Sequence, residues 1–216
     1  MCLLPLNFNI NCMNEPWIKH PVVLKGQLVE LHPLEKVHFA QLLPLTADKR
    51  LWEFYPADYS DEQKFTTSYN TSLADRDKGS NYPFVILHKQ SGKLIGSTRY
   101  LNIVPDYKQL EIGFTWITQP YWGTAINFEC KLLLMTYAFE MLKTVRVQLR
   151  TDENNIRSRT AIQKIGGKFE GILRKDRPRD NGTYRNTASF SILDTEWPEA
   201  REKIIAQLNE KLVVTK

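Results

Sequence analysis

The stretch from Glu111 to Leu142 constrains the fold of this chain more than any other part of its sequence. It reads EIGFTWITQPYWGTAINFECKLLLMTYAFEML. Residues 111–117 are mostly β-branched or aromatic, which favours a strand. The following residues contain Pro120 and Gly123 and are typical of a turn, and the apolar periodicity beyond them predicts a long helix from about residue 124 to 142. A strand, a tight turn and a helix in this order can hold an anion.

The turn before that helix is a candidate phosphate site. The first amides of a helix have no partner within it, and the helix dipole adds roughly half a positive charge there. Gly123 and Ala125 let a ligand approach the backbone, whereas Pro120 has no amide to donate, so residues 122–127 would form the cradle. Neither GxxxxGK(S/T) nor GxGxxG occurs here, which argues against the two common nucleotide loops. A purely structural turn is the alternative.

Composition and charge narrow the class of protein. The chain has 216 residues, 42% hydrophobic and 25% charged, as is typical of a globular protein with one core. Its net charge of +5 suits a polyanionic small ligand or an acidic protein partner. There is no block of five or six basic residues and no apolar run long enough to cross a bilayer, so we expect neither nucleic acid nor membrane as a partner.

The cysteines and histidines do not predict a metal site. Cys2, Cys12 and Cys130 are odd in number and lack CxxC spacing, and the histidines form no HExxH pair. We therefore expect no metal and no disulfide framework, and a cytoplasmic location follows from that. Cys130 lies inside the predicted helix and is expected to be a core residue.

The first twelve residues carry no charge, so they lack the basic region of a signal peptide. We expect residues 1–21 to be an N-terminal extension, with Met13 as the natural start of translation. Residues 22–199 would form one domain, and residues 200–216 would be the end of a last helix and a tail.

The remaining pattern predicts a single α/β (α+β) domain with a mixed central sheet. Helices are expected over 34–45, from a Ser60–Gln63 capping box to Asp77, from Asn154 or Asn155 to Gly166, and from Asp194 or Thr195 to Lys211. Strands are expected over 22–31, with Gly26 as a possible turn or bulge, and over 84–89, 94–104, 146–151, 168–174 and 183–193. The two strands that flank the long helix should be parallel, because a strand–helix–strand crossover usually makes them so.

Two sequence blocks within this order of elements resemble a known family. QPYWGTA is similar to the pyrophosphate signature (Q/R)xxGx(G/A), matching at Gly123 and Ala125 but with Pro120 at the first position. TDENNIRSRTAIQKIGGKFEG is similar to NxxSxxxxEKxGF, from Asn155 to Gly166. Together with EIGFTWI they resemble the GNAT superfamily of acetyl-CoA-dependent N-acetyltransferases, and within it the RimJ/RimL branch, over residues 22–199.

The resemblance implies acetyl-CoA as cosubstrate. The strands at Glu111 and Arg146 would splay apart, and the pantetheine arm would lie in the gap. Backbone groups of residues 114–118 would bind the pantetheine amides, and amides of residues 122–127 the pyrophosphate. The implied cofactor contacts are Phe114, Trp116, Ile117, Trp122, Gly123, Thr124, Ala125, Ile126, Asn127, Asn155 and Ser158. Thr124 and Asn155 have helix capping as their alternative role.

In this family an amine usually attacks the thioester directly. Glu111 is our candidate for accepting the amine proton through a water, with a strand-end salt bridge as the alternative. Many family members have a tyrosine as the general acid one helical turn after Ser158, but this chain has Ile162 there. Ser158 is therefore the candidate for relaying a proton to the thiolate.

The acceptor amine would bind on the opposite side of the splay. Our candidate contacts are Trp52, Tyr55 and Tyr100, with Phe54, Tyr59, Arg99 and Tyr184 as further candidates. The resemblance favours the α-amino group of a protein or peptide over another small amine, in a monomer or homodimer. A GNAT-fold module that binds acetyl-CoA without turnover is the alternative from a different class.

Overall fold

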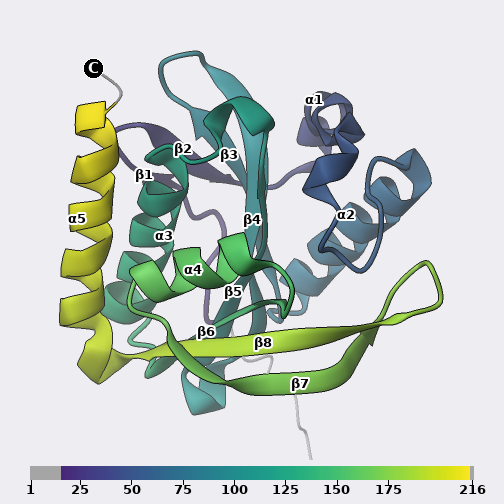
Figure 1. Ribbon diagram of the computed structural model, residues 1–216. Coiled ribbons are helices and arrows are strands. Elements are labelled where there is room, and N and C mark those ends of the chain that lie inside the picture. The colour runs from purple at the N-terminus through teal and green to yellow at the C-terminus, as the bar shows by residue number, and fades with distance from the viewer. Residues whose placement is uncertain (1–15, 215–216) are drawn as a thin grey trace, which may run out of the picture.

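Eight strands form one mixed sheet in the computed structural model, which describes residues 16–214 (Figure 1). The spatial order is β1-β2-β3-β4-β5-β6-β8-β7. The strands are β1 Leu24–Lys25, β2 Val29–Pro33, β3 Tyr82–His88, β4 Lys93–Val104, β5 Gln109–Ile117, β6 Arg146–Asp152, β7 Lys168–Pro178 and β8 Tyr184–Leu193. Only β5 and β6 pair in parallel among these strands. The predicted fold class and the predicted parallel crossover are both confirmed.

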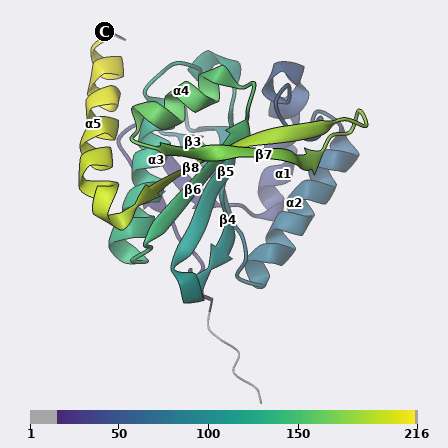
Figure 2. The ribbon, with the colours of Figure 1, turned by 60° about the horizontal axis from the view of Figure 1, so that its bottom comes forward.

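The helices cover both faces of the sheet (Figures 1 and 2). They are α1 Phe39–Leu42, α2 Glu62–Asp77, α3 Ile126–Thr136, α4 Ile156–Lys164 and α5 Trp197–Val214. α3 and α5 pack on one face, and α1 and α2 lie on the other. Each face has its own apolar core: Ile117 belongs to the core under α3, whereas its neighbour Trp116 belongs to the core under α2, as alternation along a strand requires.

β5 and β6 are paired only at their beginnings. Gln109 to Glu111 pair with Arg146 to Gln148, and beyond this point the two strands separate. On its other side β5 carries a bulge against β4, where Ser97 opposes Trp116 but Arg99 opposes Gly113. Phe114 lies in this bulge with a left-handed φ of 48°. The expected splay is therefore present, and it opens next to a distorted stretch of β5.

The hairpin of β7 and β8 crosses the end of the sheet, and its tip reaches the α2 side (Figures 1 and 2). The amide of Asp180, at this tip, donates to the carbonyl of Pro56 at 3.0 Å. The Asp180 carboxylate also forms an ion pair with Lys64 of α2. The hairpin thereby connects segments that are far apart in the sequence and encloses the space between them.

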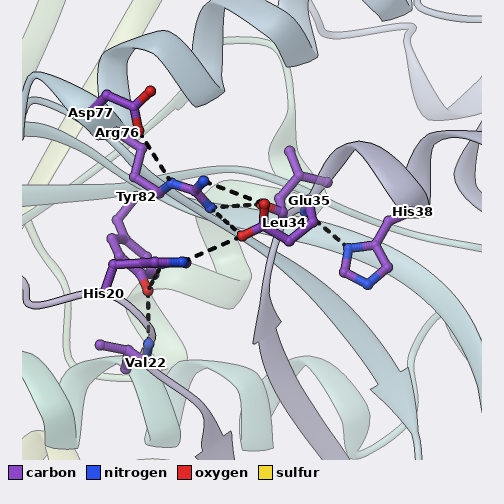
Figure 3. A network of polar contacts seen from close by, with 8 residues as sticks. All are labelled: His20, Val22, Leu34, Glu35, His38, Arg76, Asp77 and Tyr82. Atoms are coloured by element: carbon purple, nitrogen blue, oxygen red, sulfur yellow. Dashed lines mark hydrogen bonds and ion pairs between the residues drawn. The ribbon is translucent and has the colours of Figure 1, made fainter.

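A polar network fastens the start of the described chain to β3 (Figure 3). The hydroxyl of Tyr82 accepts a hydrogen bond from the amide of Val22 at 2.8 Å and lies 3.0 Å from Nδ1 of His20. Glu35 pairs with Arg76 of α2 at 2.7 Å. This network joins α2, the 34–38 turn and residues 20–22 around β3.

Local elements near the N-terminus differ from our predictions. The single strand expected over 22–31 is two short strands separated by a turn at Gly26, because the Glu129 carboxylate accepts hydrogen bonds from the amides of Gln27, Leu28 and Val29, each at 2.8 Å. The helix expected over 34–45 is only a four-residue α1 flanked by 3₁₀ turns. Pro44 has no amide to continue an α-helix, which accounts for its early end.

Two helix ends also differ. The cap of α2 is Asp61, whose carboxylate accepts from the Lys64 amide at 2.8 Å, and not the predicted Ser60. The long helix changes to a π-helical turn over Tyr137–Met141, where the Leu142 amide donates to the Tyr137 carbonyl.

The two chain ends bear on the predicted domain limits. Ile18 is buried in the core, and so are Ala200 and Ile204 of α5. The proposed start at Met13 lies outside the described residues. No helix within residues 16–214 is long and apolar enough to span a bilayer.

Candidate active site

The separation of β5 and β6 opens a cavity of about 340 Å³. Its walls come from both strands, the start of α3, α4 and the segment 50–59. The lining includes Trp122, Gly123 and Asn127 around the start of α3, and also Glu111 and Tyr55, whose part of the cavity we call the acceptor end. The sequence elements predicted to act together therefore line one continuous space.

The turn before α3 has the geometry of an anion cradle. Gly123 has a φ of +72°, and a Cβ added there would meet no atom within 4 Å, so its backbone faces open space. The first backbone bond into α3 is from the Glu129 amide to the Ala125 carbonyl, at 3.0 Å. The amides before Glu129 therefore precede the helical ladder and point toward the turn. Thr124 caps the turn, since its hydroxyl donates to the Tyr121 carbonyl at 2.8 Å.

Two arginines lie over Trp122 beside this cradle, and Arg50 is already paired with Asp48 at 2.6 Å, so Arg157 supplies the positive charge. The guanidinium of Arg157 lies 4.5 Å from the centre of the Trp122 ring, and that of Arg50 lies 5.6 Å from it. The indole Nε1 of Trp122 donates to the Ile117 carbonyl at 2.6 Å, which fixes the ring. The Trp122 ring is thus held in one position, and two guanidinium groups lie over it beside the cradle.

Glu111 is a buried carboxylate at the fork, with a fractional exposure of 5%. It accepts a hydrogen bond from Nδ2 of Asn102 at 2.8 Å and lies 3.5 Å from Nε of Arg150 on β6. Two neighbours therefore hold this carboxylate in place inside the cavity lining. Glu111 therefore both lines the cavity and forms the salt bridge that was its predicted alternative role.

Asn155 and Ser158 begin α4 on the β6 side of the cavity, and both line it. The side-chain oxygen of Asn155 accepts from the Ser158 amide at 2.9 Å, so Asn155 is the cap of this helix. Ile162 lines the same wall. The wall therefore offers the Ser158 hydroxyl and no phenol.

Lys131 is a cavity residue that sequence reasoning missed. It lies one turn after Asn127 on α3, is only 8% exposed, and its ammonium donates to the hydroxyl of Thr115 at 3.1 Å. Burial lowers the pKa of Lys131 to about 8. A single lysine inside an otherwise apolar helical stripe was the signal that could have indicated it.

The comparisons with known proteins identify the family. The sequence pattern described as Acetyltransferase (GNAT) domain matches residues 29–168. The chain belongs to the GNAT acetyltransferase family. The homologues carry the name N-acetyltransferase, and the protein is accordingly an acyltransferase of a family that uses acetyl-CoA.

Individual relatives agree with this GNAT assignment. The Bacillus subtilis protein named "Probable N-acetyltransferase YjcK" is 26% identical over 182 residues, covering 81% of this chain and 98% of its own length. A crystal structure of a GCN5-related N-acetyltransferase from Brucella melitensis is 26% identical, with a TM-score of 0.78, and the match covers 87% of this chain and 85% of that one. Mycobacterium smegmatis RimJ in complex with CoA-disulfide shares the fold, with a TM-score of 0.72 at 21% identity and coverage of 85% and 90%.

The residues present fit the cosubstrate of the GNAT family. Phosphate groups need donors and positive charge. The amides of Trp122 and Ile126 are already engaged, with the Gln119 carbonyl at 3.0 Å and the Thr124 hydroxyl at 3.3 Å, so the other amides before Glu129 supply the donors and Arg157 supplies the charge. The unpaired edge of β5 can extend its backbone hydrogen bonds to an amide-bearing chain. The predicted cofactor residues that line the cavity are Phe114, Trp116, Ile117, Trp122, Gly123, Asn127, Asn155 and Ser158. Ala125 and Ile126 are buried behind the cradle, so only their backbone can contribute.

The predicted acceptor contacts divide into two groups. Tyr55 lines the cavity, and its hydroxyl donates to the Thr115 carbonyl at 2.7 Å. Trp52 lies behind it in the core: its ring packs edge-on at 5.2 Å from that of Tyr55, and its Nε1 donates to the Thr46 carbonyl. Tyr100 is fully buried, and its hydroxyl donates to the Leu134 carbonyl at 2.6 Å. Trp52 and Tyr100 are therefore core residues rather than acceptor contacts.

Two of the further acceptor candidates, Phe54 and Tyr59, line the cavity. Arg177 of β7 and Arg185 of β8 also line it, and the sequence patterns did not indicate them. Tyr184, by contrast, is 56% exposed and lies beside Lys175 on the hairpin. Within residues 16–214 no group of histidine, cysteine and acidic side chains could hold a metal ion.

Proposed function

We propose that this GNAT protein acetylates the amino group of a protein N-terminus or of a small amine by direct attack on acetyl-CoA. The observation that carries the proposal is the single cavity that joins the anion cradle at Gly123 to the buried carboxylate of Glu111. When bound, acetyl-CoA supplies the acetyl thioester. The chain then has to bind and orient it, deprotonate the amine and protonate the departing thiolate.

Binding is assigned to the cradle and to the free edge of β5. The amides of residues 123–125 and of Asn127, with the cation of Arg157 beside them, hold the pyrophosphate, since those of Trp122 and Ile126 already have partners. The backbone of Phe114 to Ile117 holds the pantetheine amides, since β6 has moved away from this edge. Trp116 supports this segment from behind through its bond to Tyr69, at 2.9 Å.

Glu111 is assigned as the proton acceptor, acting through a water. Asn102 and Arg150 fix the carboxylate from two sides, so it cannot rotate away from the cavity. An α-amino group has a pKa near 8 and needs little help to lose its proton, whereas a lysine near 10.4 needs more. The arrangement therefore suits an α-amino acceptor better than a lysine side chain.

Two groups can return a proton to the thiolate. Ser158 on α4 is the group expected from the sequence, and as a hydroxyl it can act only as a relay. Lys131 on α3 lines the same cavity, and its pKa of about 8 lies close to that of a thiol, near 8.5. We assign the proton donation to Lys131, with Ser158 as its alternative.

Assignment of the chain to the RimJ/RimL branch is the part of this proposal that specifies the acceptor amine. Its support is the sequence similarity around Gly123 and Asn155, together with the likeness of part of the chain to the Bacillus subtilis protein named "Putative ribosomal N-acetyltransferase YdaF", 33% identical over 49% of this chain and 57% of its own length. On this basis we assign the α-amino group of a protein or peptide as acceptor.

The experiment has a binding stage and a turnover stage. Thermal unfolding is measured with acetyl-CoA and, as controls, with ATP and NAD; a ligand at about 100 times its Kd should raise the midpoint by roughly 5–10 °C. Release of free thiol from acetyl-CoA is then followed with a panel of N-terminal peptides and small amines. Binding without release by any amine would favour a cofactor-binding module, and no shift with acetyl-CoA would refute the proposed site.

A further inference from the structure

A second cavity lies beside the first, between α2 and β4. Its volume is about 590 Å³. Along α2 its wall is a row of polar side chains that includes Gln63, Thr67, Ser68 and Thr71. Tyr59 lines both cavities, so this space adjoins the first.

Arg99 of β4 lines this second cavity and is 4% exposed. Two of its nitrogens, Nε and Nη2, are buried without a hydrogen-bond partner among residues 16–214, and none of the ion pairs in that part of the chain includes it. A guanidinium cannot release its proton at ordinary pH. Burying this charge without an anion is costly, and the structure as it stands does not satisfy it.

Two rings compensate for part of that cost. The guanidinium carbon of Arg99 lies 3.9 Å from the centre of the Phe114 ring and 4.9 Å from that of Tyr69. Ring faces attract a cation but accept no strong hydrogen bond, so Nε–H and Nη2–H stay unpaired. Phe114 is the bulged residue of β5, so the cation also touches the strand that forms the first cavity.

Other unpaired groups gather in the same place. Ser72 Oγ and Asn81 Oδ1 are buried without a partner, and both residues line this cavity. With the two nitrogens of Arg99 they make four of the seven such atoms in residues 16–214. Unsatisfied buried groups are rare, and their concentration around one cavity indicates a binding site rather than scattered packing faults.

We propose that this cavity binds a carboxylate group, held by Arg99 through Nε and Nη2. These nitrogens form one edge of the guanidinium and donate in parallel, which matches the two oxygens of a carboxylate. The Ser72 hydroxyl can donate to the same anion. Asp75 and Asp180 also line the cavity, each already paired with a lysine, and their charge disfavours a phosphate relative to a monoanion.

Entry requires a local movement, because both nitrogens are covered. Tyr59 is half-buried, lines both cavities and packs edge-on against Phe114 at 5.1 Å. Rotation of this ring would uncover Arg99 and join the second cavity to the acceptor end of the first. The carboxylate can thus belong to the amine acceptor itself or to a separate small acid.

The binding test does not depend on acetyl transfer. Thermal unfolding of the whole protein is measured against rising sodium acetate or sodium lactate, with sodium chloride at equal ionic strength as reference. A midpoint rise of roughly 5–10 °C over the chloride series is expected once the carboxylate reaches about 100 times its Kd. Sodium phosphate should give a smaller rise than either carboxylate.

Three variants make this test specific. Arg99→Met keeps the apolar stem without the charge and should lose the response. Arg99→Lys keeps the positive charge but lacks the two parallel donors of the guanidinium, so its midpoint should rise less. Arg201→Met removes an equal charge from α5 and should respond like the wild type. No rise in the wild type, or the same rise in Arg99→Met, would overturn the proposal.

A second arm identifies the source of the carboxylate, and it rests on the proposed function. Acetylation of 4-aminobutanoate and of butylamine is compared in the wild type and Arg99→Met. A lower KM for the carboxylated amine, by about tenfold and only in the wild type, assigns the carboxylate to the acceptor. Equal KM values with a retained acetate response assign the site to a separate acid. Failure of acetyl-CoA to stabilise the protein would count against the proposed function alone, since the acetate series needs no cosubstrate.

Discussion

Glu111 on β5 and Arg150 on β6 face each other where the two parallel strands part, with a carboxylate oxygen 3.5 Å from Nε of the guanidinium. The last backbone pair between these strands involves Glu111 itself, opposite Gln148. The ion pair therefore lies at the closed end of the fork, and the cavity begins beyond it. A strand pair that opens would otherwise leave Glu111 free to turn toward solvent.

Glu111→Gln should lower kcat by roughly a hundredfold or more, because a general base contributes about 10²- to 10⁴-fold. The amide keeps the size of the side chain but cannot take up a proton. Thiol release at saturating acetyl-CoA and amine checks this. Glu170→Gln is the matched control, since it removes a carboxylate paired with Arg146 outside the cavity. An equal loss in both variants would contradict the role of Glu111.

Lys131 should make kcat fall as the pH becomes alkaline. Its pKa is about 8, so the ammonium that donates to the thiolate is lost as the pH rises through that value. We expect kcat at saturating substrates to decline above about pH 8 in the wild type. Lys131→Met should have a lower kcat without this decline. A pH profile of kcat that is identical in shape in the variant would exclude Lys131 as the donor.

The same residue makes a prediction about stability. The pKa of Lys131 falls from an ordinary 10.5 to about 8 on folding, so the unfolded chain binds more protons between these values. The resulting destabilisation is present below about pH 8, is about 3 kcal/mol by the conversion of 1.36 kcal/mol per pKa unit, and fades as the pH rises to 10.5. Lys131→Met should therefore be more stable than the wild type in urea at pH 7, with a gap that narrows toward pH 10.5.

Gly123 and Gly92 provide a matched pair of left-handed glycines. Their φ values are +72° and +65°, and an added Cβ would meet nothing within 4 Å at either position. Alanine should cost each of them about 1 kcal/mol of stability. Only Gly123→Ala should also weaken acetyl-CoA binding, by about tenfold in Kd, because its Cβ would stand where the phosphate approaches. Calorimetric titration of both variants distinguishes a ligand effect from backbone strain.

Glu129 should be worth more to stability than its place in a helix suggests. Its two oxygens accept from three backbone amides of the β1–β2 turn, so Glu129→Gln leaves at least one of them without an acceptor. We expect a loss of about 2–3 kcal/mol, or a midpoint lower by roughly 4–12 °C. Glu199→Gln, which removes an exposed carboxylate paired with Lys203, should leave the unfolding midpoint nearly unchanged. Equal unfolding midpoints in Glu129→Gln and Glu199→Gln would show that the turn does not need the Glu129 carboxylate.

Local patterns were enough to predict the central part of the fold. The β5 strand, the turn at Gly123 and the cap at Asn155 depend on residues close together in the sequence, so their signals are complete within a short window. The cap of α2 shows how narrow that window is: Ser60 and Asp61 both suit the position, and the carboxylate that reaches the Lys64 amide is that of Asp61. Pro44 could have shortened the first predicted helix on the sequence alone.

Local sequence patterns could not predict contacts between distant segments of the chain. Gly26 marks a possible turn in the sequence, but the contact that holds this turn comes from Glu129, about a hundred residues later. Trp52 and Tyr100 are aromatic like Tyr55, and only the register of the strands and the packing of segment 50–59 decide which rings face the cavity. Arg99 was an acceptor candidate and Lys131 is a single lysine in an apolar stripe, but no local pattern shows that both are buried beside the bulged stretch of β5.

The carboxylate of Glu129 also bears on the electric field at the cradle. An acid in the first turn of a helix ordinarily competes with an incoming anion for the positive end of that helix. Here the three amides of the β1–β2 turn take up the negative charge on the side away from the cavity, and Gly26 leaves room for it, since an added Cβ would lie 2.5 Å from the carboxyl group. Because the β1–β2 amides stabilise the Glu129 carboxylate, the start of α3 stays attractive to phosphate. A substitution in the β1–β2 turn should therefore change the affinity for acetyl-CoA.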